Sequence, residues 1–553
     1  MASDKYNAPL DAIFESLNRS DAPGLVVGVA KAGSTVYRRG FGLASIEHGV
    51  ANTPSTRMRI GSTSKHFTCL AALLLAEEGK LEIDAPANTI LPELPPLRGI
   101  PTLRQFMSHT SGYRCEIDLW ELGSGMAMQP QGEALAAQLR QTDVNFAPGD
   151  GQLYCNGGYH LLSLAIERAS GLPFEQFLFE RIFEPLGMTD TQSIPSDMAI
   201  TPGIATMHLP TPDGRWRRGI FPTDSLRGEG AMVSTVDDML TWLAHFRGPK
   251  RVGSEASWSQ LIETAQLNNG LRTTYALGLM RHLYRGVEVI HHAGGVIGGQ
   301  CQMLTVPEHA LDIVLMTNGA PASPVALAYK IVDAILGDEA LGAAPVMAGI
   351  EGFRHLIGTR YHGEKSGMTF GFGEVSDKLG VSVFNTPPAP VLRDEGEVLR
   401  VGFEDVALGE LIWRRADLAA RSDGAAPPTI DFSESGTVER FHRLSDTPPP
   451  TKEAGLALVG RYRSPDLDAE AKIEFEGEAL SLTLRTTYAG RKVQLEALSD
   501  DVFGGAGEIS LFFVLTLSHG ARGVDGFRLS TGRTRGLWFG RIAEPTPAQE
   551  LVE

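Results

Sequence analysis

The stretch that decides the fold is Ser62-Thr63-Ser64-Lys65, followed by the apolar run His66-Phe67-Thr68-Cys69-Leu70-Ala71-Ala72-Leu73-Leu74-Leu75-Ala76. The run closes at Glu77-Glu78-Gly79, so we expect a buried helix with a glycine at its C-terminal end. Residues three positions apart share a helix face, which places the Ser62 hydroxyl beside the Lys65 amine. A serine is a poor nucleophile until a base takes its proton, and a desolvated lysine is such a base. The pattern predicts Ser62 as a nucleophile and Lys65 as its base.

The bulk composition sets limits on the class of protein. A chain of 553 residues exceeds one ordinary core, so two to four domains are expected. A formal charge of −17 argues against nucleic acid and anionic membranes as partners. The four cysteines lack C-x-x-C spacing and are expected to be buried thiols, with no metal or cofactor. Without a visible signal sequence or an apolar run long enough to span a membrane, the expected location is the cytoplasm.

Strand and helix patterns predict an α/β sandwich in the first part of the chain. Residues 24–30 and 34–41 alternate as two strands of a hairpin. A mixed, loop-rich region then runs to about residue 300. Strands at 300–306 and 311–317 and a helix at 325–336 close the unit, so the sheet is expected to contain both ends of this part of the chain.

The texture changes after Gly337. Residues 353–413 and 458–542 show short alternating strands punctuated by glycine, asparagine and proline, which predicts two small antiparallel β-barrels. The Ser-, Asp-, Gly- and Pro-rich stretch 422–450 is expected to be a linker. The predicted domains are a catalytic domain at 1–337, a first barrel at 346–418 and a second barrel at 455–553.

Tyr154-Cys155-Asn156 follows the serine by about ninety residues. On an extended segment the phenol and the amide point to the same side. We expect Tyr154 to share the role of base with Lys65, and Asn156 to orient Lys65 and bind a substrate carbonyl. The alternative is a surface turn with a packed tyrosine, which an isolated motif of this kind would favour.

His291-His292-Ala293-Gly294-Gly295 precedes the closing strands. His292 is the candidate third catalytic group, and Gly294 would allow substrate backbone to approach a strand closely. The backbone N–H groups of Ser62 and Gly295 are the candidate oxyanion hole. His291 is the rival of His292, but it lacks the His-x-Gly pattern.

Together, these motifs resemble those of penicillin-recognising serine hydrolases of the class C β-lactamase and peptidase S12 type. The resemblance covers roughly residues 25–337, and the segments 107–112 and 230–235 also look like recurrent segments of that family. It implies a serine β-lactamase-like catalytic α/β sandwich. Lys365-Ser366-Gly367 imitates the alternative Lys-[Ser/Thr]-Gly element, but it falls in the expected first barrel and is interpreted as a chance match. The three motifs are Ser62-x-x-Lys65, Tyr154-x-Asn156 and His292-x-Gly294.

His-x-Gly in place of Lys-Thr-Gly makes the chain more similar to D-aminopeptidases and related amidases. That resemblance implies a serine hydrolase that cleaves amide bonds of D-amino-acid amides or peptides through a Ser62 acyl-enzyme. It also implies that a loop of the last barrel, near residues 486–495, reaches the catalytic cleft. Here that loop carries Arg491 and Lys492 where the related enzymes have an acid, so these are candidate substrate-binding residues that favour a carboxylate or a neutral acyl group. The alternative is a solvated basic loop outside the cleft.

Two other functions compete with the amidase hypothesis. One is an esterase or acyltransferase with the same nucleophile, and the other is a non-hydrolytic protein that binds β-lactams or peptides. The proton-transfer groups argue against the binder, because a binder has no use for them. The expected partner is a small amide, peptide or ester substrate; the oligomeric state is left open, with a homodimer as one candidate.

Overall fold

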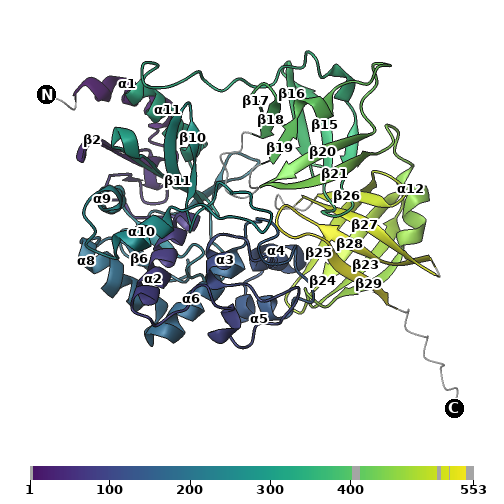
Figure 1. Cartoon of the computed structure of the whole chain (residues 1–553), viewed down its shortest axis with the longest axis horizontal. Coiled ribbons are helices and arrows are strands. Elements are labelled where there is room, and N and C mark those ends of the chain that lie inside the picture. Colours follow the sequence, from purple (N-terminus) through teal and green to yellow (C-terminus); the bar gives the residue numbers. More distant parts are fainter. Residues whose placement is uncertain (1–3, 402–410, 507–511, 522, 543–553) are drawn as a thin grey trace.

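The computed structural model describes residues 4–401, 411–506, 512–521 and 523–542 (Figure 1). Its first part is built on a six-stranded antiparallel sheet. In that sheet the first hairpin pairs with a strand from residues 311–317, as predicted, so both ends of this part meet. The strand order is β10 (Met280–Tyr284), β11 (Val287–Val296), β12 (Gly299–Val306), β13 (Leu311–Thr317), β1 (Leu25–Lys31) and β2 (Ser34–Phe41).

Helices cover both faces of this sheet. Alternate side chains of β1 enter two different cores: Leu25, Val27 and Val29 pack in the core that includes α1 (Asp4–Phe14) and α11 (Pro324–Leu336). Val26 and Ala30 enter the larger core on the other face. That larger core belongs to a helical layer: α2 (Lys65–Glu77), α3 (Leu103–Met107), α5 (Glu133–Leu139), α6 (Asn156–Ser170), α7 (Phe174–Leu178), α8 (Glu184–Leu186), α9 (Val236–Arg247) and α10 (Glu255–Leu261). Helix α4 (Glu116–Ser124) contacts α5 and α6, but its Leu119 and Leu122 pack in the core of the last barrel.

Short strands join this layer to the sheet. They include β5 (Met58–Arg59) and β9 (Met232–Ser234), which pair with each other just before the nucleophile segment. The others are β3 (Leu43–Ser45), β4 (Val50–Ala51), β6 (Gln192–Ser193), β7 (His208–Pro210) and β8 (Trp216–Arg218).

The second part is an eight-stranded antiparallel sheet that curls into a nearly closed barrel. In Figure 1 it is the green region. Its order is β16 (Lys378–Val383), β15 (Thr369–Val375), β14 (Arg360–His362), β21 (Thr437–Arg443), β20 (Thr429–Glu434), β19 (Leu411–Arg414), β18 (Val398–Val401) and β17 (Leu392–Asp394).

The predicted linker at 422–450 is wrong in its middle, because β20 and β21 lie there. Ile430 and Phe432 alternate into the core of the curled sheet, which is the period of a half-buried strand. The polar residues that suggested a linker form the hairpin turn, where Ser435 and Gly436 both have positive φ angles of 46° and 86°. The sheet therefore extends beyond the predicted limit of residue 418.

The third part is a closed eight-stranded barrel, drawn in yellow-green to yellow in Figure 1. A short helix, α12 (Thr451–Ala454), precedes it. The fold class predicted from the sequence is confirmed: a mixed α/β part is followed by two antiparallel barrel-like parts. The barrel strands are β22 (Gly460–Ser464), β23 (Ala469–Glu476), β24 (Ala479–Arg485), β25 (Gly490–Ala497), β26 (Val502–Ala506), β27 (Phe512–Gly520), β28 (Gly523–Ser530) and β29 (Leu537–Ile542).

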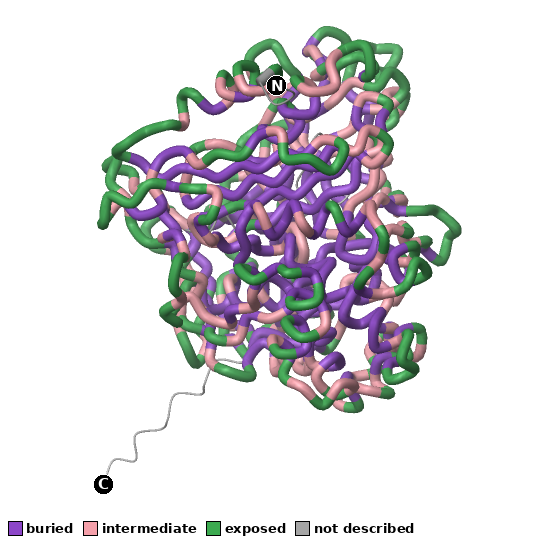
Figure 2. The backbone as a smooth tube through the Cα atoms, turned by 90° about the vertical axis from the view of Figure 1, so that its left-hand side faces the viewer, coloured by how far each residue is buried: buried purple, intermediate pink, exposed green. Residues whose placement is uncertain are grey.

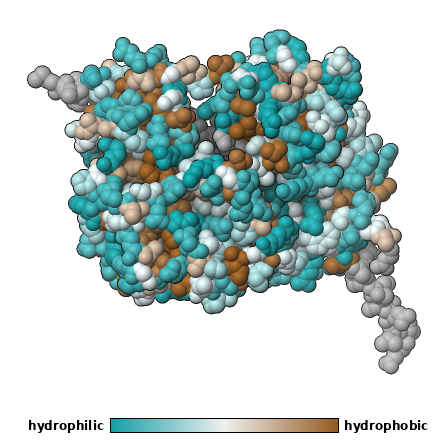
Figure 3. Space-filling model, viewed as in Figure 1, coloured by the Kyte–Doolittle hydropathy of each residue, from teal (hydrophilic) through white to brown (hydrophobic). Residues whose placement is uncertain are grey.

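Burial follows this architecture. Figure 2 shows buried backbone through the middle of the molecule and exposed backbone along its outer turns. On the face drawn in Figure 3, hydrophobic residues lie in small groups among hydrophilic ones. All four cysteines are buried thiols, as expected. Within the described ranges, no helix combines the length and hydropathy needed to span a bilayer.

Candidate active site

The nucleophile segment is a 3₁₀ turn, Gly61–Ser64, that leads directly into α2. Backbone and side-chain bonds to Met232 hold it: Ile60 N–H donates to the Met232 carbonyl at 3.0 Å, and Met232 N–H donates to Ser64 Oγ at 3.3 Å. Ser62 is half-buried and lines a cavity of about 520 Å³. The predicted helix is present, and the candidate nucleophile faces open space at its start.

Lys65 is fully buried beside this serine. Its Nζ lies 3.1 Å from Ser62 Oγ, 2.8 Å from Asn156 Oδ1 and 2.6 Å from the Glu229 carbonyl oxygen. Burial lowers the pKa of Lys65 to about 7, against the opposing influence of the Glu229 carboxylate. The amine therefore loses its proton near neutral pH.

The three contacts of Lys65 define what happens when it loses that proton. A neutral amine keeps two N–H donors and gains one lone pair. The two shorter contacts, to Asn156 and Glu229, are with oxygens that only accept, so the N–H donors stay on them. The lone pair is then left for the Ser62 hydroxyl, which is the geometry of a general base.

Tyr154 lies on the other side of Lys65 and lines the same cavity. The Lys65 Nζ is 4.8 Å from the centre of the Tyr154 ring, and the His109 ring stacks on that ring at 4.1 Å. Cys155 is extended, but Asn156 is the first residue of α6 rather than part of the same extended segment. The structure thus brings Ser62, Lys65, Tyr154 and Asn156 together, while the role of Tyr154 as a base shared with Lys65 stays a prediction.

His292 is buried on β11 behind the cavity wall. Its Nε2 is 2.9 Å from the Tyr275 hydroxyl, which is also 3.1 Å from His109 Nε2. Burial, helped by the positive charge of Lys65, lowers the pKa of His292 to about 3, so the ring is neutral. His291 is also buried, and its Nδ1 contacts Gln302 Nε2 at 3.2 Å, away from the chain that His292 joins.

His109, Tyr275 and His292 form a hydrogen-bonded series, and the contacts at its two ends fix which ring nitrogen of each histidine carries the proton. Cys155 N–H donates to His109 Nδ1 at 3.1 Å, so the proton of neutral His109 is on Nε2. His109 then donates to Tyr275, and the Tyr275 hydroxyl donates to His292 Nε2. His292 keeps its own proton on Nδ1, next to the Ala293 carbonyl. These hydrogen bonds hold the His109, Tyr275 and His292 rings in place around Tyr154. A direct catalytic role for His292 stays a prediction.

The two glycines after His292 have different reasons for being glycine. A Cβ on Gly294 would lie 1.8 Å from the Ile60 carbonyl oxygen, so protein backbone, and not the predicted substrate backbone, lies against this glycine. A Cβ on Gly295 would meet nothing within 4 Å, and Gly295 lines the cavity. A Cβ on Gly61, in contrast, would lie 2.8 Å from the Gly295 nitrogen. The close approach of these segments places Ser62 and Gly295 on one wall, as an oxyanion hole requires.

A family model described as Beta-lactamase matches residues 10–336, which is more than half of the chain. The chain belongs to the beta-lactamase family. It is a serine hydrolase, and the matched residues include the nucleophile segment, Tyr154 and the His292 strand.

Relatives extend the similarity beyond this family domain. The chain is similar to the D-aminopeptidase of Brucella anthropi, 28% identical over 479 residues that cover 83% of this chain and 82% of the relative. The D-aminopeptidase of Brucella canis is 27% identical over 469 residues, with the same coverage of the two chains. Among solved structures, the octameric penicillin-binding protein homologue from Pyrococcus abyssi is 17% identical, with a TM-score of 0.54, and covers 98% of this chain and 100% of its own. The D-amino acid amidase from Ochrobactrum anthropi SV3, solved with L-phenylalanine amide, is 22% identical, with a TM-score of 0.50 over 60% of this chain and 98% of its own.

The last barrel contributes one wall of the catalytic cavity. Arg533, in the turn between β28 and β29, lines it together with Glu121 of α4. The Arg533 guanidinium forms an ion pair with Asp118, which is buried. Burial, with a smaller contribution from the Asp118 carboxylate, raises the pKa of Glu121 to about 7 against the pull of Arg533 and Arg491. Above that pH, Glu121 is a carboxylate, and it lines the cavity together with the Arg533 guanidinium, which is already paired with Asp118.

The predicted substrate-binding loop of this barrel is placed elsewhere. Neither Arg491 nor Lys492 lines the cavity: Arg491 donates to the Glu121 backbone carbonyl, and Lys492 pairs with Glu476 on the barrel surface. The turn before β25 packs on the outer side of α4 instead, where the Tyr488 ring lies 5.1 Å from that of Trp120. A loop of the last barrel does reach the cavity, but it is the turn at residues 531–536.

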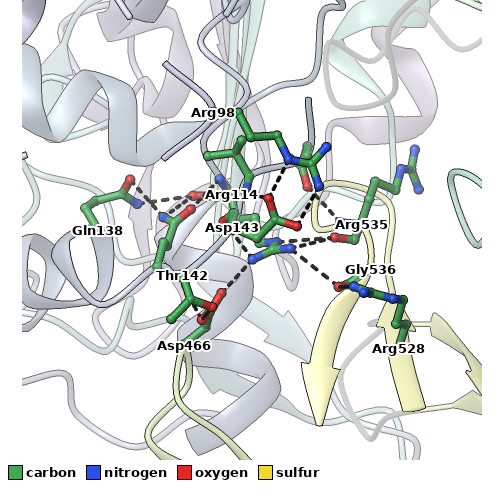
Figure 4. Close-up of polar contacts among 12 residues, drawn as sticks. Arg98, Arg114, Gln138, Thr142, Asp143, Asp466, Arg528, Arg535 and Gly536 are labelled. Carbon is green, nitrogen blue, oxygen red and sulfur yellow. Dashed lines mark hydrogen bonds and ion pairs between the residues drawn. The ribbon is translucent and has the colours of Figure 1, made fainter. Parts of the chain in front are cut away.

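Buried polar contacts hold that turn in place (Figure 4). Arg114 and Asp466 form an ion pair at 2.6 Å with only 2% and 4% of their side chains exposed, and Arg114 also donates to the Arg535 carbonyl at 3.2 Å. Asn145 bonds the same turn twice, donating to the Arg533 carbonyl at 3.1 Å and accepting from Arg535 N–H at 2.8 Å. The position of Arg533 is therefore set by contacts on both sides of it.

Sequence reasoning missed Glu229, Tyr275 and Arg533. Glu229 acts through its backbone carbonyl, which leaves no trace in a side-chain motif. Tyr275 contacts His109 and His292, which lie far from it in the sequence. Arg533 lies in Ser530-Thr531-Gly532-Arg533-Thr534-Arg535-Gly536, whose polar turn between two strands was a detectable signal.

Proposed function

We propose that this serine hydrolase cleaves amide bonds of D-amino-acid amides or short peptides that carry a free amino group, through an acyl-enzyme on Ser62. The observation that carries the proposal is the buried Lys65 amine, 3.1 Å from Ser62 Oγ and with a pKa of about 7. It supports a base that is neutral at working pH. The D-aminopeptidase relatives and the anionic Glu121 in the cavity support the class of substrate.

The chemistry follows in two halves. Lys65 takes the Ser62 proton as Oγ attacks the amide carbonyl, and the N–H groups of Ser62 and Gly295 bind the oxyanion. The proton then passes to the leaving amine, directly from Lys65 or through Tyr154. Water enters where the amine has left, and its oxygen attacks the acyl carbonyl carbon while Lys65 takes one of its protons. The bond between that carbon and Ser62 Oγ then breaks, Lys65 returns the proton to Oγ, and the acid product departs.

Glu121 supports recognition of the substrate's ammonium group. Because Arg533 is already paired with Asp118, its charge opposes an ammonium less than a free guanidinium would. The cavity thus differs from the sequence expectation, in which Arg491 and Lys492 made a free amine unfavourable.

The test is turnover on matched D- and L-aminoacyl p-nitroanilides, with Ser62→Ala as the inactive control. We expect D-substrates with a free amine to be hydrolysed faster than their L-counterparts, and Ser62→Ala to hydrolyse neither while keeping its folded spectrum. Preference for L-substrates would overturn the stereochemical part of the proposal. Turnover of esters alone would favour the esterase alternative, and phosphonate labelling of Ser62 without any turnover would favour a binder.

A further inference from the structure

A second cavity, which we call the junction cavity, lies where the three parts of the molecule meet. Its volume is about 190 Å³. One side is the segment 145–153 of the catalytic part, and the turn that follows β14 and the strands β20 and β21 form another. Arg535 of the last barrel closes it. Lining residues on which the argument rests are Phe146, Gln152, Lys365, Met368, Phe432 and Arg535.

Two buried polar atoms in this lining have no hydrogen-bond partner among the described residues. They are the side-chain oxygen of Gln152 and the Nε of Arg535, with 9% and 6% of those residues exposed. An unsatisfied buried donor or acceptor is costly, and a bound group that supplies the missing partner removes that cost. Here the missing partners are one donor, for Gln152, and one acceptor, for Arg535.

Charges of both signs line the same cavity. Lys365 is exposed and has no ion pair within the described part of the chain, while Glu439 accepts the backbone N–H groups of Lys365 and Ser366 at 2.8 and 3.1 Å. Asp150, from the catalytic part, adds a second carboxylate, and Glu434 adds a third, which is paired with the Arg535 guanidinium at 2.8 Å. The Lys365-Ser366-Gly367 motif, which has no place in the catalytic site, thus contributes to the lining of this one.

The remaining wall is apolar. Met368 and Phe432 are 1% and 2% exposed, and Leu153 and Phe146 face them from the catalytic part. Because a dry cavity of about 150 Å³ is enough to hold benzene, this one has room for one branched or aromatic side chain. It does not have room for a peptide.

From this combination we infer that the junction cavity binds a single zwitterionic α-amino acid with an apolar side chain. The carboxylate accepts from Lys365, the ammonium donates to the nearby carboxylates, and the side chain lies against Met368 and Phe432. The unpaired atoms of Gln152 and Arg535 are covered in this structure, and a small turn of either side chain lets it add a contact to the ammonium or to the carboxylate. The inference does not rest on the proposed function, because no residue of the catalytic chemistry takes part. Leu153 lines this cavity and Tyr154 lines the other, so a bound amino acid lies one residue from the catalytic phenol.

The experiment is calorimetric titration of leucine and phenylalanine, in both enantiomers, into the whole enzyme after its Ser62 has been modified with a phosphonate. Modification occupies the catalytic cavity, so remaining saturable binding belongs elsewhere. We expect one site per chain, and glycine weaker than leucine by roughly thirtyfold or more, because the leucine side chain is buried. Isovalerate and isobutylamine, which each lack one of the two charges, should also bind more weakly than leucine.

Two lysine variants locate the site. Lys365→Glu, at an exposed position, should weaken leucine binding by about tenfold or more by removing the cation that meets its carboxylate. Lys378→Glu makes the same charge change on the same sheet, at an exposed residue that does not line the cavity, and should leave binding unchanged. Three results would each overturn the inference. They are no binding of leucine to the phosphonate-modified enzyme, equal affinity for glycine and leucine, and equal affinity for leucine with and without the Lys365→Glu substitution. If Ser62 resists phosphonate, that result counts against the proposed function alone, and the comparison of the two lysine variants still decides this one.

Discussion

At the scale of the residue, Lys65 shows how burial and hydrogen bonding divide the work of making a base. Burial lowers its pKa to about 7, which supplies the neutral amine. The acceptors Asn156 and Glu229 then fix the direction of the lone pair toward Ser62. The first effect sets how many molecules are active at a given pH, and the second sets how well each one is aligned.

The first prediction concerns pH. Because only neutral Lys65 accepts the Ser62 proton, kcat/KM should rise about tenfold per pH unit below 7 and level off above it. A neutral ester should be used, since its binding does not need a charged Glu121. The same acid limb should persist in Glu121→Gln, although Glu121 itself has a pKa of about 7. A limb centred near the ordinary lysine pKa would contradict the assignment of Lys65.

The second prediction concerns Glu121. Glu121→Gln keeps the shape of the cavity but removes the anion, so KM for substrates with a free amine should rise by roughly tenfold to a hundredfold. The KM for N-acetylated versions should not rise. Steady-state kinetics on matched pairs of free and acetylated D-aminoacyl p-nitroanilides measures this. An equal change for both members of a pair would mean that Glu121 supports the cavity without reading the amine.

At the scale of the element, β11 carries two adjacent glycines with opposite tasks. Gly294 lets the strand touch the backbone before the nucleophile, and Gly295 borders the cavity. Since neighbouring residues of a strand face opposite sides, one strand both supports the nucleophile segment and offers an N–H group beside it.

The third prediction compares these glycines. Gly294→Ala should lower the free energy of unfolding by about 1–3 kcal/mol or more, because its Cβ would overlap the Ile60 carbonyl oxygen. Gly295→Ala should fold normally, and its methyl group should reduce kcat/KM by crowding the acyl site. Urea unfolding and ester hydrolysis, measured on both variants, separate the two effects. Equal stability of the two variants would show that the contact with Ile60 is relaxed.

Elements with a regular local pattern were predictable from sequence. The prediction of the first hairpin is confirmed. Its turn residues, Ala32 and Gly33, adopt the positive φ angles that such turns need. The prediction of helix α2 is also confirmed, because a long apolar run is a clear signal of a buried helix. By contrast, α4, α5 and α6 fell in a region interpreted as loop-rich. Lys65 and three of the groups around it, Ser62, Tyr154 and Asn156, were predicted from the spacing of their motifs. Tyr275 and Arg533 depend on long-range packing that no local pattern records.

At the scale of the whole molecule, the buried pair Arg114–Asp466 joins the catalytic part to the last barrel. Burial lowers the pKa of Arg114, and the Asp466 carboxylate opposes that shift. Such a pair adds little net stability over an apolar contact, but removing one partner leaves an uncompensated buried charge. The pair therefore penalises any arrangement in which the two parts pack together but leave one of these charges buried without the other.

The fourth prediction follows from that asymmetry. Asp466→Ala should cost about 3–5 kcal/mol, because Arg114 stays buried without its partner. Arg114→Met combined with Asp466→Leu should cost less than Asp466→Ala alone. Urea unfolding of the three chains measures this, and limited proteolysis reports whether the barrel detaches. A double variant less stable than the single one would show that the pair contributes more than charge compensation.

The position of Arg533 also has a consequence in time. Arg533 follows Ser62 by 471 positions in the chain (533 − 62), yet both line one cavity. At 5–20 residues per second, a ribosome needs roughly 25–95 s to travel between them. During that interval the nascent chain holds a serine and its base with one wall of the cavity still unmade and Asp118 without its guanidinium. The wall that Arg533 provides can therefore form only after the whole catalytic part has been translated.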